Sequence, residues 1–227
     1  MRPNRKFPSV CVDGFYDNPD EVLAWAKSCR YLPDPNGQWP GMRSDDLSKL
    51  DKDFVSRFSE KFFKIFFEQE SPSFVLTTYF QVIKPFHEDK DHPMNWGWIH
   101  TDSDPQEEQP GSPEYAGLVY LSPDADLNTG TSIFKLKGKQ AEPLTDQPCK
   151  EDLFTFKGVD ETVYADNMRH IRSQYEETVR YNNVYNRLIA FESKHYHAAN
   201  NYHNDDYRFT QVFFVSSIES KTYPLQR

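Results

Sequence analysis

The chain has 227 residues, a formal net charge of −9 and an aromatic content of 15%. This length suits one sizeable hydrophobic core or at most two small domains. The acidic balance and the lack of any Lys/Arg-rich run disfavour a nucleic-acid-binding surface. We see neither an apolar run of membrane-spanning length nor a signal peptide, and three widely spaced cysteines predict no disulfide framework. We therefore expect a cytoplasmic protein without a membrane partner.

Helices are predicted in the N-terminal part of the chain. Asn18, followed by proline and two acids, is typical of a helix start, and this helix is predicted to run to about Arg30. Prolines and glycines over 32–41 predict a loop, and Arg43 beyond it is expected either to clamp this loop to the body or to face a pocket. An aromatic stripe at helical spacing predicts a second helix over about 52–68.

Strands are predicted to dominate from residue 74 onward. Seven or eight strands separated by polar loops are typical of a sandwich or jelly roll. The charged stretch 158–182 is predicted to be a helical insert, and the loop 103–114 is a candidate for a mobile lid. The strands are predicted at about 74–83, 95–101, 115–122, 131–137, 152–157, 187–193 and 208–218.

The pattern His-x-Asp occurs three times, and its surroundings distinguish the copies. The copies at 87–89 and 203–205 lie in polar, turn-rich stretches, which predicts solvated loops. His100 instead ends an aromatic run that begins at Trp96. Because residues i and i+2 of a strand point to one face, His100 and Asp102 are expected to be able to hold one metal ion together.

A second group of polar residues lies near the C-terminus. His197 follows a short apolar run, and Arg208 and Thr210 share one face at the start of the most apolar run in the sequence. Two imidazoles and one carboxylate can occupy one face of an octahedral ferrous ion and leave three positions open. An arginine in a buried strand needs a partner, which is either a structural carboxylate or a bound one.

The order of these residues carries a resemblance to a family. His-x-Asp, a distal His and Arg-x-Thr about ten residues later resemble the Fe(II)/2-oxoglutarate-dependent oxygenases, including prolyl-hydroxylase-like members and an uncharacterised phage and bacterial branch. The resemblance spans roughly 74–218. Residues 128–134 are similar to the family's Gly-Gly-x-x-x-Phe strand, although Thr129 stands at the first Gly. Residues 152–156 are similar to the strand that precedes the distal His.

The resemblance implies a fold and a domain organisation. The fold would be mainly β with supporting helices, a double-stranded β-helix or jelly roll with N-terminal helices packed on one sheet. We expect a single oxygenase domain over 1–227, with a helical lead-in at 1–70. The jelly-roll core would cover 74–218 and contain the helical insert at about 158–182.

The resemblance also implies a role for each candidate residue. No catalytic residue is expected beyond the metal ligands. His195 is the alternative to His197, but it misses the family's spacing to Arg208. Tyr79 and Tyr120 fall where related enzymes often bind the co-substrate, although packing in the core explains them equally well. The implied site consists of metal ligands His100, Asp102 and His197 and of co-substrate residues Arg208, Thr210, Tyr79 and Tyr120.

The implied function is that of a dioxygenase that uses Fe(II), 2-oxoglutarate and O2 to hydroxylate a small molecule, an amino acid or a protein side chain. The intact Asp102 favours hydroxylation over halogenation, because related halogenases carry a small residue there. Two alternatives stay open. A cupin-like metal-dependent hydrolase or isomerase would leave Arg208 without an obvious task, and a jelly-roll binding protein would need no catalytic centre. The prime substrate and the oligomeric state do not follow from the sequence.

Overall fold

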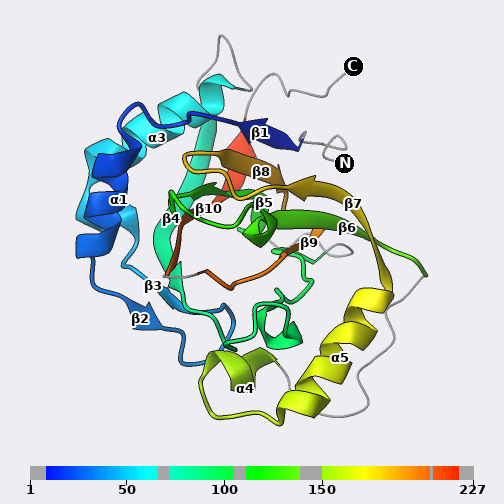
Figure 1. Ribbon diagram of the computed structural model, residues 1–227. Helices are drawn as coiled ribbons and strands as arrows, with labels where there is room; N and C mark the ends of the chain where they lie inside the picture. Colours follow the sequence, from blue (N-terminus) through cyan, green and yellow to red (C-terminus); the bar gives the residue numbers. More distant parts are fainter. Residues whose placement is uncertain (1–8, 66–71, 105–110, 139–149, 205–206, 220–227) are drawn as a thin grey trace.

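Two antiparallel β-sheets form the centre of the protein (Figure 1). The computed structural model describes residues 9–65, 72–104, 111–138, 150–204 and 207–219. The larger sheet has the strand order β1 (Val10–Val12), β8 (Leu188–Glu192), β5 (Pro113–Tyr120), β10 (Arg208–Glu219), β4 (Ser73–Ile83), β3 (Met42–Arg43) and β2 (Leu32–Pro33). The smaller sheet has the order β7 (Tyr175–Tyr181), β6 (Thr131–Leu136) and β9 (Tyr196–Ala199). The protein is therefore mainly β with helices, as predicted.

Helices α1 (Pro19–Ser28), α2 (Leu47–Leu50) and α3 (Lys52–Lys64) cover one face of the larger sheet (Figure 1). The Asp51 side chain begins α3 by accepting a hydrogen bond from the backbone N–H of Phe54 at 2.9 Å. Phe58 and Phe62 then point at the sheet, where their rings lie 5.2 and 5.0 Å from that of Phe213. This aromatic layer packs against one face of the sheet and leaves the other face for the cavity described below.

Strand β10 lies between β4 and β5, and its side chains point alternately to the two faces of the larger sheet. Phe209, Phe213 and Val215 belong to the core cluster shared with the helices. Arg208 and Thr210 alternate with them and line a cavity on the opposite face. The period of two along the strand therefore sends two polar side chains to the inside of the protein.

Helix α4 (Lys150–Phe154) occupies a segment that was predicted to be a strand, so the prediction for 152–157 is wrong. Leu153 and Phe154 pack in one buried cluster with Tyr164 and Met168 of α5 (Glu161–Ser173). The alternation of aromatic and polar residues resembles a strand. Here both apolar side chains extend from a helix, and contacts with α5 bury them. Tertiary packing thus overrides the local pattern.

Two further elements differ from the prediction. The insert 158–182 is helical only over α5, and its second half is strand β7, which pairs with β6. Residues 95–101 form no strand, because the chain passes through the 3-10 turn η1 (Pro93–Asn95) and makes a single β-bridge at His100.

The ends of several predicted elements lie outside the described residues. Helix α3 ends at Lys64, and 66–68 of the predicted helix are not described. Most of the candidate lid, 105–110, is likewise outside the described residues, and β5 begins at Pro113. None of the helices in the described ranges has the length and apolarity that a membrane span requires.

Candidate metal and co-substrate site

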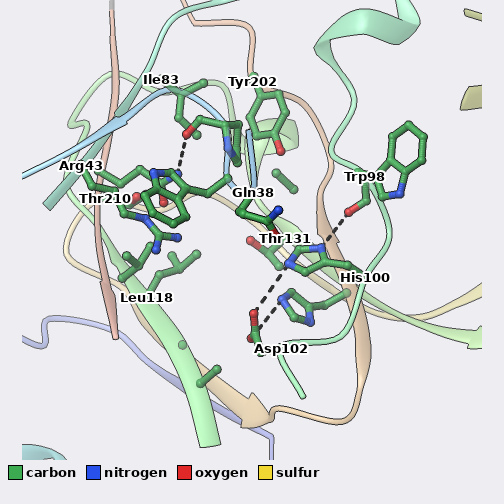
Figure 2. Close-up of a pocket in the computed structure, with 18 of the residues that line it drawn as sticks. Gln38, Arg43, Ile83, Trp98, His100, Asp102, Leu118, Thr131, Tyr202 and Thr210 are labelled. Carbon is green, nitrogen blue, oxygen red and sulfur yellow. Dashed lines mark hydrogen bonds and ion pairs between the residues drawn. The ribbon is translucent and has the colours of Figure 1, made fainter. Parts of the chain in front are cut away.

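His100 and Asp102 lie next to each other in the pocket (Figure 2), and His197 joins them in one cluster. One ligand atom from each lies within 4.8 Å of the other two. His197 Nε2 is 3.4 Å from Asp102 Oδ2, and His100 Nε2 is 3.7 Å from Asp102 Oδ1. Metal–ligand bonds of about 2.1 Å hold neighbouring ligand atoms roughly 3.0 to 3.4 Å apart, so small movements would let all three contact one ion.

The backbone brings the two histidines together from distant parts of the chain. His100 and His197 form an isolated antiparallel bridge in which each backbone N–H donates to the other's carbonyl, at 3.1 and 2.9 Å. The backbone N–H of Asp102 donates to Ser193 O at 2.9 Å. Gly97 permits this approach, because a Cβ there would lie 2.5 Å from Ala199 O. These contacts align the segment with β9 although it is not itself a strand.

Backbone carbonyls orient both imidazole rings. Nδ1 of His100 lies 2.9 Å from Trp98 O, and Nδ1 of His197 lies 2.9 Å from His195 O. A carbonyl oxygen can only accept, so each Nδ1 carries a hydrogen, and in the neutral ring Nε2 presents a lone pair toward Asp102. Although 44% of the His100 side chain is accessible, desolvation, helped by His197, lowers its pKa to about 4. His100 is therefore neutral at physiological pH, as a metal ligand must be.

A cavity of about 340 Å³ opens beside the three residues and contains Arg208 and Thr210 in its wall. Arg208 is only 3% exposed, and burial lowers its pKa. Its Nε donates to Thr129 O at 3.3 Å, whereas Arg208 Nη2 and Thr210 Oγ1 find no partner within the described ranges. No described carboxylate pairs with Arg208. Since an unpaired buried charge is costly, this part of the cavity fits an anionic ligand.

The two candidate tyrosines lie behind the cavity wall. Tyr120 is fully buried, its hydroxyl hydrogen-bonds Thr131 Oγ1 at 3.0 Å, and the Arg208 guanidinium lies 5.6 Å from its ring centre. Tyr79 is half-buried on β4 and lies against Arg43, whose guanidinium is 5.6 Å from its ring centre. Neither is among the residues that line the cavity. The structure thus brings Tyr120 to Arg208 and leaves Tyr79 away from it.

The cavity wall also contains residues that the sequence did not single out. Gln38, Trp39 and Lys150 line it, and so does Arg43, for which two positions had been open. The signal for these residues is weak: a tryptophan in the Pro/Gly-rich loop and an arginine just beyond it. His195 lies apart from the three converging residues, with Nε2 3.8 Å from a carboxylate oxygen of its neighbour Glu192.

The sequence matches one protein family, and the fold is similar to that of solved structures. The family described as "Family of unknown function (DUF6445)" matches residues 3–209. No protein with a curated description matches the sequence. Among solved structures, HygX from Streptomyces hygroscopicus, with nickel and 2-oxoglutarate bound, aligns with a TM-score of 0.54 and 12% identity over 96% of this chain and 85% of its own.

Two further structures are similar. The epimerase SnoN, in complex with Fe3+, alpha ketoglutarate and nogalamycin RO, has a TM-score of 0.52 and 14% identity over 94% of this chain and 80% of its own. A 2OG-Fe(II) oxygenase family protein from Burkholderia pseudomallei has a TM-score of 0.50 and 12% identity over 92% of this chain and 84% of its own. At these identities the likeness is one of fold, and it confirms the resemblance to the oxygenase superfamily at that level.

Proposed function

We propose that this chain, which belongs to the DUF6445 family, is a non-haem Fe(II)- and 2-oxoglutarate-dependent dioxygenase. One observation carries the proposal: two imidazoles and a carboxylate converge beside a cavity whose buried arginine has no carboxylate partner in the described ranges. We further propose that residues 1–227 form one domain with a jelly-roll core. Its substrate would be a small molecule, an amino acid or a peptide, and it would act in the cytoplasm.

The residues present fit the metal and the co-substrate. Two imidazole nitrogens and one carboxylate oxygen are the donor set of the facial triad that binds Fe(II), and both Nε2 atoms are free to ligate. Arg208 and Thr210 offer donors without acceptors, which the distal carboxylate of 2-oxoglutarate would satisfy. When bound, Fe(II) with 2-oxoglutarate and O2 supplies the oxidising chemistry.

The chain's own residues bind, orient and exclude water. The carbonyls of Trp98 and His195 keep the imidazoles in one tautomer, which raises the precision of the site. Arg208, fixed by Thr129 O, would hold the co-substrate in one direction. Apolar side chains from the larger sheet, such as Leu118, would exclude water from it. Because Asp102 is a carboxylate rather than a small residue, the proposed outcome is hydroxylation.

The test is iron-dependent conversion of 2-oxoglutarate to succinate without added substrate. We expect turnover by the wild type and its loss in His100→Ala and Arg208→Ala, whereas His92→Ala, a matched histidine outside the cavity, keeps it. Binding of 2-oxoglutarate to Ni(II)-loaded protein, measured by calorimetry, gives a second readout that needs no turnover. Absence of both turnover and binding would refute the proposal and favour the hydrolase, isomerase or binding-protein alternatives.

A further inference from the structure

Four buried donor atoms around the cavity have no acceptor in the described ranges, and they form two groups. Arg208 Nη2 and Thr210 Oγ1 make up the first, which the proposed co-substrate would satisfy. Arg43 Nε and Trp39 Nε1 make up the second. Because buried donors are nearly always paired, the second group calls for an acceptor of its own.

The guanidinium of Arg43 is surrounded by aromatic rings rather than by acceptors. It lies 4.5 Å from the ring centre of Trp39 and 5.5 Å from that of Phe214. Among the described residues it makes neither a hydrogen bond nor an ion pair, although the negative charges of Asp102 and Asp34 act on it from a distance. Burial lowers the pKa of Arg43 to about 10, so the side chain stays charged at neutral pH. Cation–π contacts hold the group in place but leave its hydrogen-bonding capacity unused.

The backbone holds Arg43 firmly in the cavity wall. Arg43 pairs with Gln81 in the sheet, and Gln81 pairs with Thr210, so these three side chains share one face of the larger sheet. The Gln81 side chain donates to Pro40 O at 2.7 Å. Gly41, at φ +69°, lets the chain approach β4, since a Cβ there would lie 2.3 Å from Val82 O. A side chain on so fixed a backbone is preorganised for binding.

The charges in the cavity leave a cationic excess, although the whole chain is acidic. The charged lining residues are Arg43, Lys150, Arg208 and a single acid, Asp102. A doubly charged iron, a dianionic 2-oxoglutarate, Asp102 and Arg208 would balance one another. Arg43 then remains for the rest of the cavity, since Lys150 Nζ lies 4.0 Å from a carboxylate oxygen of Glu151. A cationic pocket in a protein of net charge −9 selects an anion.

We propose that Arg43 and Trp39 bind a carboxylate group of the prime substrate, at a position separate from that of 2-oxoglutarate. Figure 2 shows Arg43 with Thr210 and Leu118 on one side of the cavity, and His100 with Asp102 on the other. The apolar side chains of Leu118, Val212 and Phe214, which also line the cavity, would contact the body of the substrate. The substrate class is therefore a small carboxylic acid with an apolar body. This inference rests on the proposed function, because a substrate held by Arg43 would react with the iron and co-substrate that the proposed oxygenase binds.

The experiment compares matched acids and amides as probes. Benzoate, 3-phenylpropanoate and butanoate, each beside its own amide, are titrated into Zn(II)-loaded protein with 2-oxoglutarate present, and binding is followed by saturation-transfer NMR. We expect the wild type to bind at least one acid more tightly than its amide. Arg43→Gln should weaken that acid by at least about tenfold, because a buried charge pair is lost. Arg57→Gln, which changes an exposed arginine on α3, should bind as the wild type does.

Calorimetry of 2-oxoglutarate separates this inference from the proposed function. Arg43→Gln should leave 2-oxoglutarate affinity unchanged within about twofold. An equal loss of acid and 2-oxoglutarate affinity would place Arg43 in the co-substrate site and overturn the inference. Failure of the wild type to bind 2-oxoglutarate, with acid binding retained, would instead refute the oxygenase while leaving the Arg43 position intact.

Two conservative variants guard against a folding defect. Arg43→Lys keeps the charge but loses the planar fork, and Trp39→Phe keeps a ring but loses the N–H donor. Both should weaken acid binding without changing the circular dichroism spectrum. The inference is wrong if no acid binds the wild type at millimolar concentration, if amides bind as well as acids, or if these folded variants bind acids as the wild type does.

Discussion

The described residues contain two clusters of two histidines and one carboxylate, and only one of them belongs to the proposed metal site. His100, Asp102 and His197 form the first, and the second combines His87, His92 and Glu161. In both clusters the possible ligand atoms lie within 4.8 Å of one another. Residue type and distance alone therefore do not distinguish them.

The partners of Nδ1 make the difference. In the second cluster, the backbone N–H of Asp89 donates to His87 Nδ1 at 2.9 Å, and that of Met94 donates to His92 Nδ1 at 3.3 Å. Each neutral ring must then carry its hydrogen on Nε2. The Nε2 of His87, which lies 3.7 Å from a carboxylate oxygen of Glu161, thus carries a hydrogen rather than a lone pair for a metal.

The surroundings reinforce this contrast. The two carboxylates differ in burial, since the Asp102 side chain is 13% exposed and that of Glu161 is 61% exposed. The rings of His87 and His92 stack with centres 3.9 Å apart, which suits packing at the surface. Of the two, only the first cluster opens on the cavity whose Arg208 has no carboxylate partner among the described residues. The hydrogen-bond partner of the second ring nitrogen is thus as informative as the ligand set itself.

Removing one carboxylate from each cluster should give the largest difference in metal affinity between the two clusters. Asp102→Ala should lower the affinity for Fe(II) or Ni(II) by more than about 100-fold, because loss of a direct ligand exceeds the cost of losing a ligand's supporting partner. Glu161→Ala should leave it unchanged. Calorimetric metal titration of both variants measures this, and equal losses would show that the two clusters do not differ.

Arg208→Gln should affect co-substrate binding and stability in opposite directions. We expect 2-oxoglutarate affinity to fall by roughly 2–5 kcal/mol, because a buried charge pair loses one partner. Without 2-oxoglutarate, the melting temperature should rise, since an uncompensated buried charge has been removed. Calorimetry and thermal unfolding test both parts. A lower melting temperature would indicate that Arg208 has a structural partner.

Gly97→Ala should disturb the approach of His100 to His197. Its new Cβ would meet Ala199 O at 2.5 Å, and overpacking of this kind costs about 1–3 kcal/mol. We expect a lower free energy of unfolding together with weaker metal binding. In Gly158→Ala, where a Cβ meets nothing within 4 Å, only the positive φ is strained, so stability alone should fall. Unchanged metal binding in Gly97→Ala would contradict the proposed role of this contact.

The two clusters should also differ in their histidine tautomers, which can be measured on the wild-type protein. In metal-free protein at neutral pH, long-range 15N–1H NMR should show the hydrogen of His100 and His197 on Nδ1. For the neutral rings of His87 and His92 it should appear on Nε2. The same tautomer in both clusters would remove the distinction drawn between them.

Sequence patterns predicted the strands of the larger sheet better than the elements around the site. The apolar runs at 74–83 and 208–218 match β4 and β10, because buried central strands are set by hydrophobic content. The pattern at 152–157 failed, because the contacts that make it helical come from α5. Strand β7 was missed because five of its seven residues are exposed and charged or polar side chains dominate it.

The candidate metal ligands could be proposed from spacing, but their geometry could not. His100 was expected at a strand end, yet it is held by a single bridge to His197, a contact across 97 residues that no local pattern encodes. The place of Arg43 in the cavity depends on the pairing of β3 with β4, which two residues in a loop-like sequence do not predict. Long-range pairing therefore decides the part of the site that sequence reasoning left open.

The most direct test is X-ray diffraction at the iron absorption edge from crystals grown anaerobically with Fe(II) and 2-oxoglutarate. We expect one anomalous peak bounded by His100 Nε2, His197 Nε2 and Asp102, with the distal carboxylate of 2-oxoglutarate at Arg208. A peak at His87, His92 and Glu161, or an iron-bound triad with no 2-oxoglutarate beside it, would contradict this expectation.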